Sequence, residues 1–194
     1  MVAYSKITGI NVSCEAYGRV PVLTLIGLLV SVVGISPNLS LAADLPDFSG
    51  AWASETWSTV GWPTEPPYTS AGHLAQQVYE ADPLDDPTQN CLSPALVLHI
   101  SAPFPHEIIQ QEHRVTFLYE SFHQIRRVWM DGRGHPEDTY PTLMGHSIGW
   151  WEDDTLVVDT RNVETGHMRP QGLPHTQNMH VIERYTLLDD RERM

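Results

Sequence analysis

Residues 145–149, Gly-His-Ser-Ile-Gly, match the Gly-x-Ser-x-Gly spacing of a hydrolase nucleophile letter for letter. In an α/β-hydrolase this serine lies on a sharp turn between a strand and a helix. Here the next residues, Trp-Trp-Glu-Asp-Asp-Thr at 150–155, lead into a β-branched run that predicts a strand and a hairpin. We therefore favour a structural role for Gly145 and Gly149 at the entry of a strand, and treat a Ser147 hydrolase as the lesser alternative.

The ten histidines raise the alternative of a metal centre. The sequence contains no His-x-x-x-His, His-Glu-x-x-His or His-x-His spacing, the patterns that present two imidazoles to one metal. His99, His106 and His113 are seven residues apart, but Pro103 and Pro105 prevent one helix from presenting them together. We therefore assign no metal ligand.

Along two predicted strands, side chains point alternately to the two faces of the sheet. Histidine and arginine then share faces with acidic and aromatic residues. Successive side chains of a strand point to opposite faces, so His123 and Arg127 share one face and Arg126 takes the other. In the last strand the same alternation opposes His180 to Glu183. Each face is mixed rather than cleanly apolar, which is typical of a ligand pocket with a few convergent polar groups.

These groups predict acid–base chemistry in a barrel pocket. An imidazole transfers protons near neutral pH, and a guanidinium stabilises a developing oxyanion. The candidate proton-transfer groups are His123 and His146. Either Arg126 or Arg127 would anchor an anionic or enolate oxygen. The orienting residues would be Tyr119, His180 and Glu183. We expect these imidazoles and guanidiniums to face one sheltered hollow.

The sequence thus predicts an exported enzyme that acts on a small molecule, of the isomerase, lyase or cyclase type, without an organic cofactor. One alternative is a non-catalytic carrier of an apolar or aromatic ligand, lined by four tryptophans: Trp52, Trp129, Trp150 and Trp151. A further alternative is a periplasmic metal-binding protein.

Composition excludes several reaction classes. The sole lysine is Lys6, so a chain that has lost residues 1–43 can neither form a Schiff base nor supply a P-loop lysine. The net charge is −13, and removal of the same residues makes it more negative by one charge. Such a surface repels nucleic-acid phosphates and anionic lipids, so we expect no nucleic-acid partner and no membrane partner after cleavage.

Residues 1–43 have the pattern of a secretory signal peptide. An uncharged apolar run covers residues 21–35, after two basic residues and before a small-residue site. This run is shorter than the roughly 20 apolar residues of a membrane span. We expect cleavage after Ala42 or Ala43, a periplasmic or secreted bacterial protein, and a single domain over residues 44–194. An uncleaved membrane anchor is the alternative.

The chain after the signal predicts a mostly β fold. One short helix is expected over residues 70–80, within an irregular layer rich in Pro and Trp. Strands are expected in seven short runs: residues 48–53, 106–111, 115–120, 124–130, 146–151, 155–160 and 179–188. Such strands form an antiparallel meander that closes into a calycin-like barrel. A simple barrel has eight strands, so two alternatives follow: the sequence is truncated at its C-terminus, or a partner such as a second copy of the chain covers the open edge.

The string from Met144 to Thr160 resembles the signature of a largely uncharacterised family of exported bacterial proteins, Gly-His-Ser-x-Gly-x-Trp-Glu-x-Asp-Thr-Leu-Val-Val-Asp-Thr. The sequence departs from it at Trp150, where Arg is expected, and at Asp153, where Gly is expected in a hairpin turn. Similar segments elsewhere are residues 48–52, 66–69, 91–94, 123–127, 131–133, 135–138, 174–175 and 180–184. The resemblance implies a calycin- or lipocalin-like barrel and no established activity, so no catalytic role follows from it.

Overall fold

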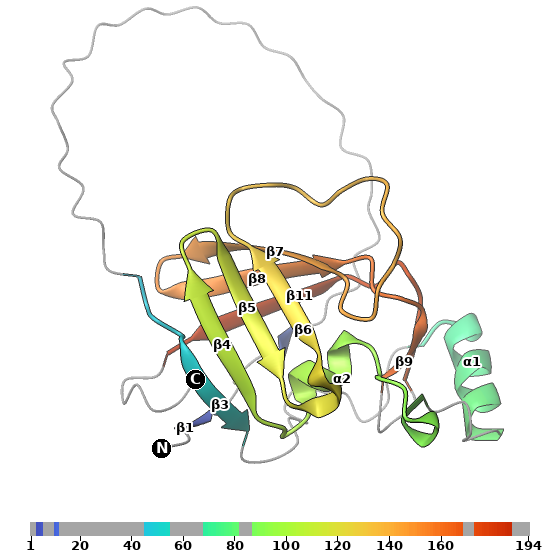
Figure 1. The fold of residues 1–194 in the computed structure, drawn as a ribbon. Helices are drawn as coiled ribbons and strands as arrows, with labels where there is room; N and C mark the ends of the chain where they lie inside the picture. Colours follow the sequence, from blue (N-terminus) through green and yellow to red (C-terminus); the bar gives the residue numbers. More distant parts are fainter. Residues whose placement is uncertain are drawn as a thin grey trace, which may run out of the picture.

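The computed structural model describes residues 3–5, 10–11, 45–54, 68–81, 87–168 and 173–187. At its centre, seven strands form a mixed sheet that curls into an open half-barrel (Figure 1). In the order in which they lie side by side, the strands are β3 (Gly50–Ser54), β4 (His106–Gln111), β5 (Arg114–Tyr119), β6 (Ile125–Trp129), β7 (His146–Glu152), β8 (Thr155–Arg161) and β11 (Val181–Thr186). All seven predicted strands are confirmed, each to within two residues at either end.

One pair of strands corrects the expected antiparallel meander. β6 and β7 are parallel, whereas the other neighbours in the seven-stranded sheet are antiparallel. A parallel pair needs a long crossover, which residues 130–145 supply. Asp131 and Gly132 do form a turn, since Gly132 has a φ of +77° and the Asp131 carboxylate accepts the Arg133 N–H at 3.3 Å. That turn leads into the crossover and not into a hairpin.

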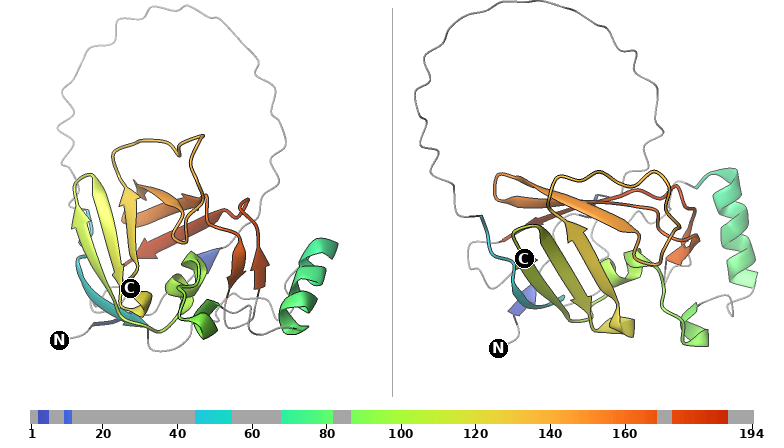
Figure 2. Two further views of the ribbon diagram at one scale, coloured as in Figure 1. Left: turned by 45° about the vertical axis from the view of Figure 1, so that its right-hand side comes forward. Right: turned by 45° about the horizontal axis from the view of Figure 1, so that its top comes forward.

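The half-barrel arises from a curl between two halves of the sheet. In Figure 1, β4, β5 and β6 run steeply while β7, β8 and β11 cross them at a large angle, and both views of Figure 2 show the same curl. Strand twist of one hand accumulates across a sheet and produces this shape. The alternation is clear in β6, where Arg126 and Val128 are buried on the inner face whereas Ile125 and Arg127 are exposed on the outer face.

A short helix that the sequence did not reveal fills part of the core. All residues of α2 (Leu96–Ser101) are buried, and Leu96 and Ile100 pack in one cluster with Phe117 of β5. The Leu96 N–H also donates to the Leu143 carbonyl at 2.9 Å. A helix of six residues is too short to show a clear helical period, which explains why alternation and periodicity missed it.

The helix α1 (Ser70–Ala81) confirms the one predicted helix. It lies beside the half-barrel in Figure 1, next to β10 (Leu173–His175), which pairs with β9 (Gly166–Met168) in a separate small sheet. Its apolar residues Leu74 and Val78 are exposed. The described residues also include two short 3-10 helices: η2 (Pro87–Asn90) and η3 (Ser121–His123).

Two short strands from the region of the predicted signal peptide lie at the edges of the sheet. β1 (Ala3–Ser5) pairs in parallel with β3, and β2 (Ile10–Asn11) pairs antiparallel with β11. The predicted cleavage site and much of the Pro- and Trp-rich layer lie outside the described residues. Within the part of the chain that the structure describes, no helix has the length and apolarity needed to cross a membrane.

Candidate functional site

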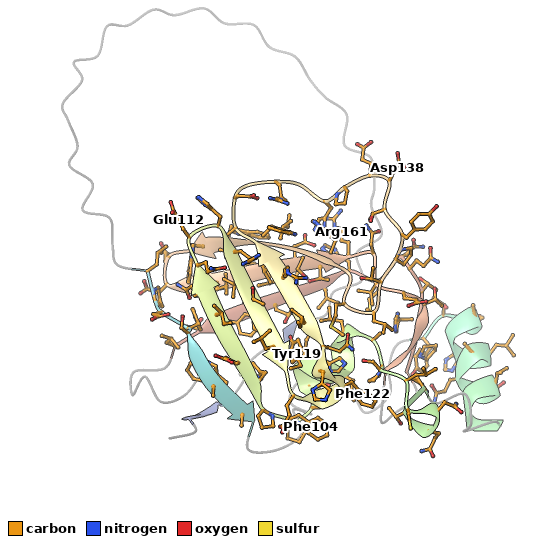
Figure 3. All side chains as sticks on the ribbon, viewed as in Figure 1. Phe104, Glu112, Tyr119, Phe122, Asp138 and Arg161 are labelled. Carbon is orange, nitrogen blue, oxygen red and sulfur yellow. The ribbon has the colours of Figure 1, made fainter. Side chains whose placement is uncertain are left out.

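The sheet separates the predicted catalytic residues onto its two faces. Arg126, Tyr119 and Glu183 lie on the inner face; Arg127, His146 and His180 lie on the outer face; His123 lies on the exposed turn η3. The expectation of one shared hollow is therefore wrong, because neighbours on a strand such as Arg126 and Arg127 point to opposite faces. In Figure 3, Tyr119 lies near α2, and Arg161 of the other half of the sheet lies beneath the long β6–β7 loop.

Arg126 and Glu183 belong to one hydrogen-bonded unit on the inner face, which we call the buried arginine cluster: Arg126, Ser147, Thr160, Glu183 and Tyr185. Arg126 Nε donates to Ser147 Oγ at 2.9 Å, and Arg126 Nη1 donates to Glu183 Oε1 at 3.0 Å. Arg126 Nη2 donates to Thr160 Oγ1 at 2.6 Å and to Glu183 Oε2, while the Tyr185 hydroxyl donates to Glu183 Oε1. The cluster thus ties β6, β7, β8 and β11 together.

The charges of this cluster stabilise each other. Burial lowers the pKa of Arg126 and is the largest single effect, but Glu183, Tyr119 and Tyr185 together outweigh it, so the pKa lies above its ordinary value. Burial raises the pKa of Tyr119 to about 12, and that of Tyr185 well above 10.0. The Arg126 and Glu183 side chains are 1% and 2% exposed. Arg126 therefore stays charged, and Tyr119 and Tyr185 stay neutral, near neutral pH. Because the cluster is closed to solvent, it has a structural role.

Ser147, the serine of the Gly-x-Ser-x-Gly string, is part of this cluster. It is 1% exposed, and its hydroxyl is bonded to Arg126 and, at 2.8 Å, to Thr160 Oγ1. The strand β7 continues past Ser147 as far as Glu152, so no strand–turn–helix elbow exists here. The structural role favoured from the sequence agrees with this geometry.

The two glycines of the Gly-x-Ser-x-Gly string allow other segments of the same chain to approach closely. Gly145 has a φ of +65°, and a Cβ there would lie 2.6 Å from the carbonyl oxygen of Arg161. At Gly149 a Cβ would lie 2.7 Å from Met130 Sδ. Only glycine fits Gly145 without strain, because a positive φ and a clash with fixed backbone coincide there.

We expect Gly145→Ala to lower the free energy of unfolding by about 2 kcal/mol or more, through backbone strain and the clash with β8. Gly134→Ala is the matched control, since a Cβ at Gly134 meets nothing within 4 Å. Urea unfolding followed by tryptophan fluorescence measures both variants. Equal stabilities of the two variants would contradict the structural role of Gly145.

Three side chains on the outer face form a second hydrogen-bonded chain, which we call the imidazole relay: Asp159 of β8, His135 of the β6–β7 loop and His146 of β7. Asp159 Oδ1 lies 3.1 Å from His135 Nε2, and His135 Nδ1 lies 2.9 Å from His146 Nδ1. His180, just before β11, also places its Nε2 2.9 Å from Asp159 Oδ1. Asp159 and His135 are about nine-tenths buried, so the relay is sheltered at that end.

The hydrogen bonds of the relay determine which nitrogen carries each proton. A carboxylate only accepts, so His135 donates from Nε2, and a neutral His135 then has a lone pair on Nδ1. His146 must donate to that lone pair from its own Nδ1, which leaves His146 Nε2 unprotonated. Among the described residues nothing bonds to His146 Nε2. The relay therefore ends in one free basic nitrogen on a half-buried side chain.

Both imidazoles of the relay favour the neutral form. Burial lowers the pKa of His135, although the nearby Asp159 charge acts in the opposite direction. Burial also lowers the pKa of His146, and the neighbouring His135 and Arg133 lower it further. His146 is therefore ready to accept a proton at neutral pH.

Two arginines lie near His146. Arg161 is the direct cross-strand partner of His146, and its Nε lies 3.5 Å from Asp159 Oδ1. Arg133, in the β6–β7 loop, stacks on Trp129 with its Cζ 3.9 Å from the ring centroid. Positive charge around His146 favours a substrate or intermediate that carries negative charge.

The β6–β7 loop brings His135 to the relay. Figure 1 shows this loop, residues 130–145, arching from the end of β6 back toward the start of β7. Thr142 fixes its far end, because it bridges to Val163 and its N–H donates to the Asn162 carbonyl at 3.1 Å. The path of the loop, and not a local motif, thus places His135 between His146 and β8.

Two further histidines lie on the inner side and are poor candidates for proton transfer. Burial lowers the pKa of both His99 and His106 to about 4. His99 Nε2 lies 3.2 Å from Ser93 Oγ, but in the described part of the chain His99 Nδ1 has no hydrogen-bond partner. Without a carboxylate behind it, His99 is a weak base toward Ser93.

The four predicted ligand-binding tryptophans do not line one cavity. Trp52 is buried and donates from Nε1 to the Phe48 carbonyl at 2.8 Å, and Trp151 stacks on Phe48. Trp129 and Trp150 lie on the outer face instead, and Trp150 is exposed. Trp129 lines a shallow depression of about 360 Å³ together with Gln111, Glu112, His113, Arg114, Asp131 and Arg133.

Sequence reasoning named His146 and His180 but missed His135, Asp159 and Arg161. A signal for Asp159 was present, because it is a charged residue inside the apolar run of β8 and alternation places it opposite to Thr160. The same alternation places Arg161 beside it. No local signal existed for His135, since its contact with His146 depends on the path of the loop.

No group of three or more His, Cys, Asp or Glu side chains within the described residues is arranged to hold a metal ion. The comparisons with known proteins found no match to this chain among family models, curated proteins or solved structures.

Proposed function

We propose that this protein is a proton-transfer enzyme for a small molecule, of the lyase or isomerase type, with His146 Nε2 as its general base. One observation carries the proposal: the side chains Asp159, His135 and His146 are hydrogen-bonded in that order. This order leaves His146 Nε2 unprotonated, and it has no hydrogen-bond partner among the described residues. As proposed, the enzyme is exported, which the signal pattern of residues 1–43 favours, and works without an organic cofactor.

The relay supports proton abstraction from a carbon acid. When His146 Nε2 takes the proton, the imidazole becomes cationic and its Nδ1–H becomes a stronger donor to His135. Asp159 holds His135 in the required tautomer, and its negative charge stabilises the positive charge on the relay. A positioned general base of this kind contributes roughly 10²–10⁴-fold to the rate.

The electron pair of the broken C–H bond stays with the substrate. In a lyase step it forms a C=C bond as a leaving group departs from the neighbouring carbon, and the proton passes from His146 to the leaving group or to water. In an isomerase step the protonated His146 returns the proton to a different carbon. Either cycle ends with neutral His146 and needs no oxidant or reductant.

We also propose that the half-barrel is related to the calycin barrels. The curl of the sheet supports this, as does the Gly50-x-Trp52 string on the first strand, where Trp52 packs in the core. The buried arginine cluster occupies the inner face of this sheet, so we propose a site on the outer face instead of in the barrel pocket.

The test uses nitrobenzisoxazole, a neutral probe whose ring opens to a coloured phenolate when a base removes its acidic proton. We expect the full chain to accelerate this elimination above buffer, and His146→Gln to reduce the acceleration about 100-fold or more. The half-maximal rate is expected at a pH below 6.5, because burial lowers the pKa of His146 and the base must be deprotonated. Deuterium incorporation from D₂O into small carbon acids, followed by NMR, extends the test to substrate-like molecules.

His73→Gln is the matched control, since His73 is exposed on α1. Equal rates for His146→Gln and His73→Gln contradict the proposal. Tight ligand binding with no turnover also contradicts it and favours a carrier. Stoichiometric metal in protein purified without a tag, lost in His180→Ala, contradicts it in favour of a metal site.

A further inference from the structure

Two arginines flank His146 on the outer face. Val128 pairs with Ser147 across β6 and β7, and both are buried on the inner face, so the preceding residues Arg127 and His146 are neighbours on the outer face. Arg161 is the cross-strand partner of His146 on its other side, in β8. Adjacent strands lie roughly 4.8 Å apart, so the free imidazole nitrogen lies within a guanidinium's reach from either side.

Arg127 is an unusual arginine in this chain. Its side chain is exposed, and no hydrogen bond or ion pair joins its guanidinium to a side chain among the described residues. Its neighbour Arg126 is buried with a full set of partners, and Arg133 is paired with Asp131. In a protein with 24 acidic and 11 basic residues, an unpaired guanidinium beside a general base is available to a ligand.

The charge balance around His146 is opposite to that of the whole chain. There are three arginines here, Arg127, Arg133 and Arg161, and two aspartates, Asp131 and Asp159. While the histidines are neutral, positive charges therefore exceed negative charges by one, whereas the net charge of the chain is −13. An anion is therefore repelled by most of the surface and attracted to this patch. Guanidinium groups bind carboxylates and phosphates with paired hydrogen bonds in a fixed plane.

We infer that the substrate carries a small oxyanion, a carboxylate or a phosphate, which Arg127 and Arg161 bind on either side of His146. The inference rests on the proposed function for the statement that the anion belongs to a substrate. Arg127 is the stronger anchor, because Asp159 already offsets part of the charge of Arg161. An oxyanion held there brings an adjacent C–H bond to His146 Nε2, and both arginines then stabilise the negative charge that develops as the proton leaves.

Binding of malonate and of inorganic phosphate to the full chain tests the inference without any turnover. The readouts are calorimetry and the NMR resonances of the His146 imidazole. We expect Arg127→Gln to raise the dissociation constant of the preferred anion about tenfold, and Arg161→Gln to raise it less. Arg184→Gln is the matched control, since Arg184 is an exposed arginine of β11 that is paired with Glu152.

The outcomes separate the two possible anions and the two proposals. Binding of malonate alone identifies a carboxylate, and binding of phosphate alone identifies a phosphate. No binding of either anion, or equal losses in Arg127→Gln and Arg184→Gln, overturns the inference. Anion binding without elimination of nitrobenzisoxazole keeps the inference as an anion site and overturns the proposed function. Elimination that neither anion inhibits overturns the inference alone.

Discussion

Asp159→Asn is expected to lower the rate of proton transfer by roughly 10²–10⁴-fold. In the structure, one oxygen of Asp159 accepts hydrogen bonds from both His135 and His180, while its other oxygen faces Arg161 Nη2 at 3.5 Å. Only a carboxylate can accept on both sides. An asparagine must turn its amide NH₂ either toward the imidazoles or toward the guanidinium, and loses the negative charge in both cases.

The first orientation of the amide reverses the relay. If the NH₂ group donates to His135 Nε2, His135 carries its proton on Nδ1. His135 Nδ1 then donates to His146 Nδ1, which must be the unprotonated nitrogen of His146. His146 Nε2 then carries a hydrogen and is no longer a base. The second orientation keeps the tautomers but places an NH₂ group against Arg161, and nothing stabilises the cation that forms on His146.

The same assay as for His146 measures this effect, and Asp154→Asn is the matched control. Asp154 is exposed in the turn between β7 and β8, on the same hairpin as Asp159, and the chemical change is identical. Circular dichroism and thermal unfolding of both variants separate a loss of activity from a loss of fold. Comparable rates for the two variants would show that the carboxylate does not orient the imidazoles.

Glu183→Ala is expected to lower the free energy of unfolding by about 3–5 kcal/mol. Glu183 is 2% exposed and receives hydrogen bonds from both Arg126 and the Tyr185 hydroxyl. Its removal leaves a guanidinium charge without compensation at a position that water does not reach, and leaves one buried hydroxyl unpaired. The cost of the uncompensated charge is larger than the net contribution of the intact pair, because two buried charges are themselves expensive to desolvate.

Two further variants distinguish this explanation from a simple loss of packing. Arg126→Met combined with Glu183→Leu removes both charges, and we expect it to recover most of the stability that Glu183→Ala loses. Glu152→Ala removes the exposed pair with Arg184 and should cost less than about 1 kcal/mol. Urea unfolding followed by tryptophan fluorescence compares the three. A double variant as unstable as Glu183→Ala would argue that shape, and not the unpaired charge, sets the cost.

The amino-acid sequence by itself determined the strands and the face that each side chain takes. Alternation is a local property, since two residues next to each other on a strand must point to opposite sides whatever the sheet does. For that reason Arg126 and Arg127 were assigned to opposite faces correctly, and so were His180 and Glu183. The turn of Asp153 also followed from sequence, because its φ of +53° is the conformation for which glycine was expected there.

The tertiary structure decided which face is buried and which residues meet across it. The parallel pairing of β6 with β7, the helix α2 and the contact of His135 with His146 all depend on where a long connection runs. No local pattern encodes that path. A shorter connection between β6 and β7 would form an antiparallel hairpin and leave His135 far from β8. The curl of the sheet also decides burial on each face. It encloses Arg126 and Glu183 on the inner face, whereas His146 and Arg127 lie on the outer face.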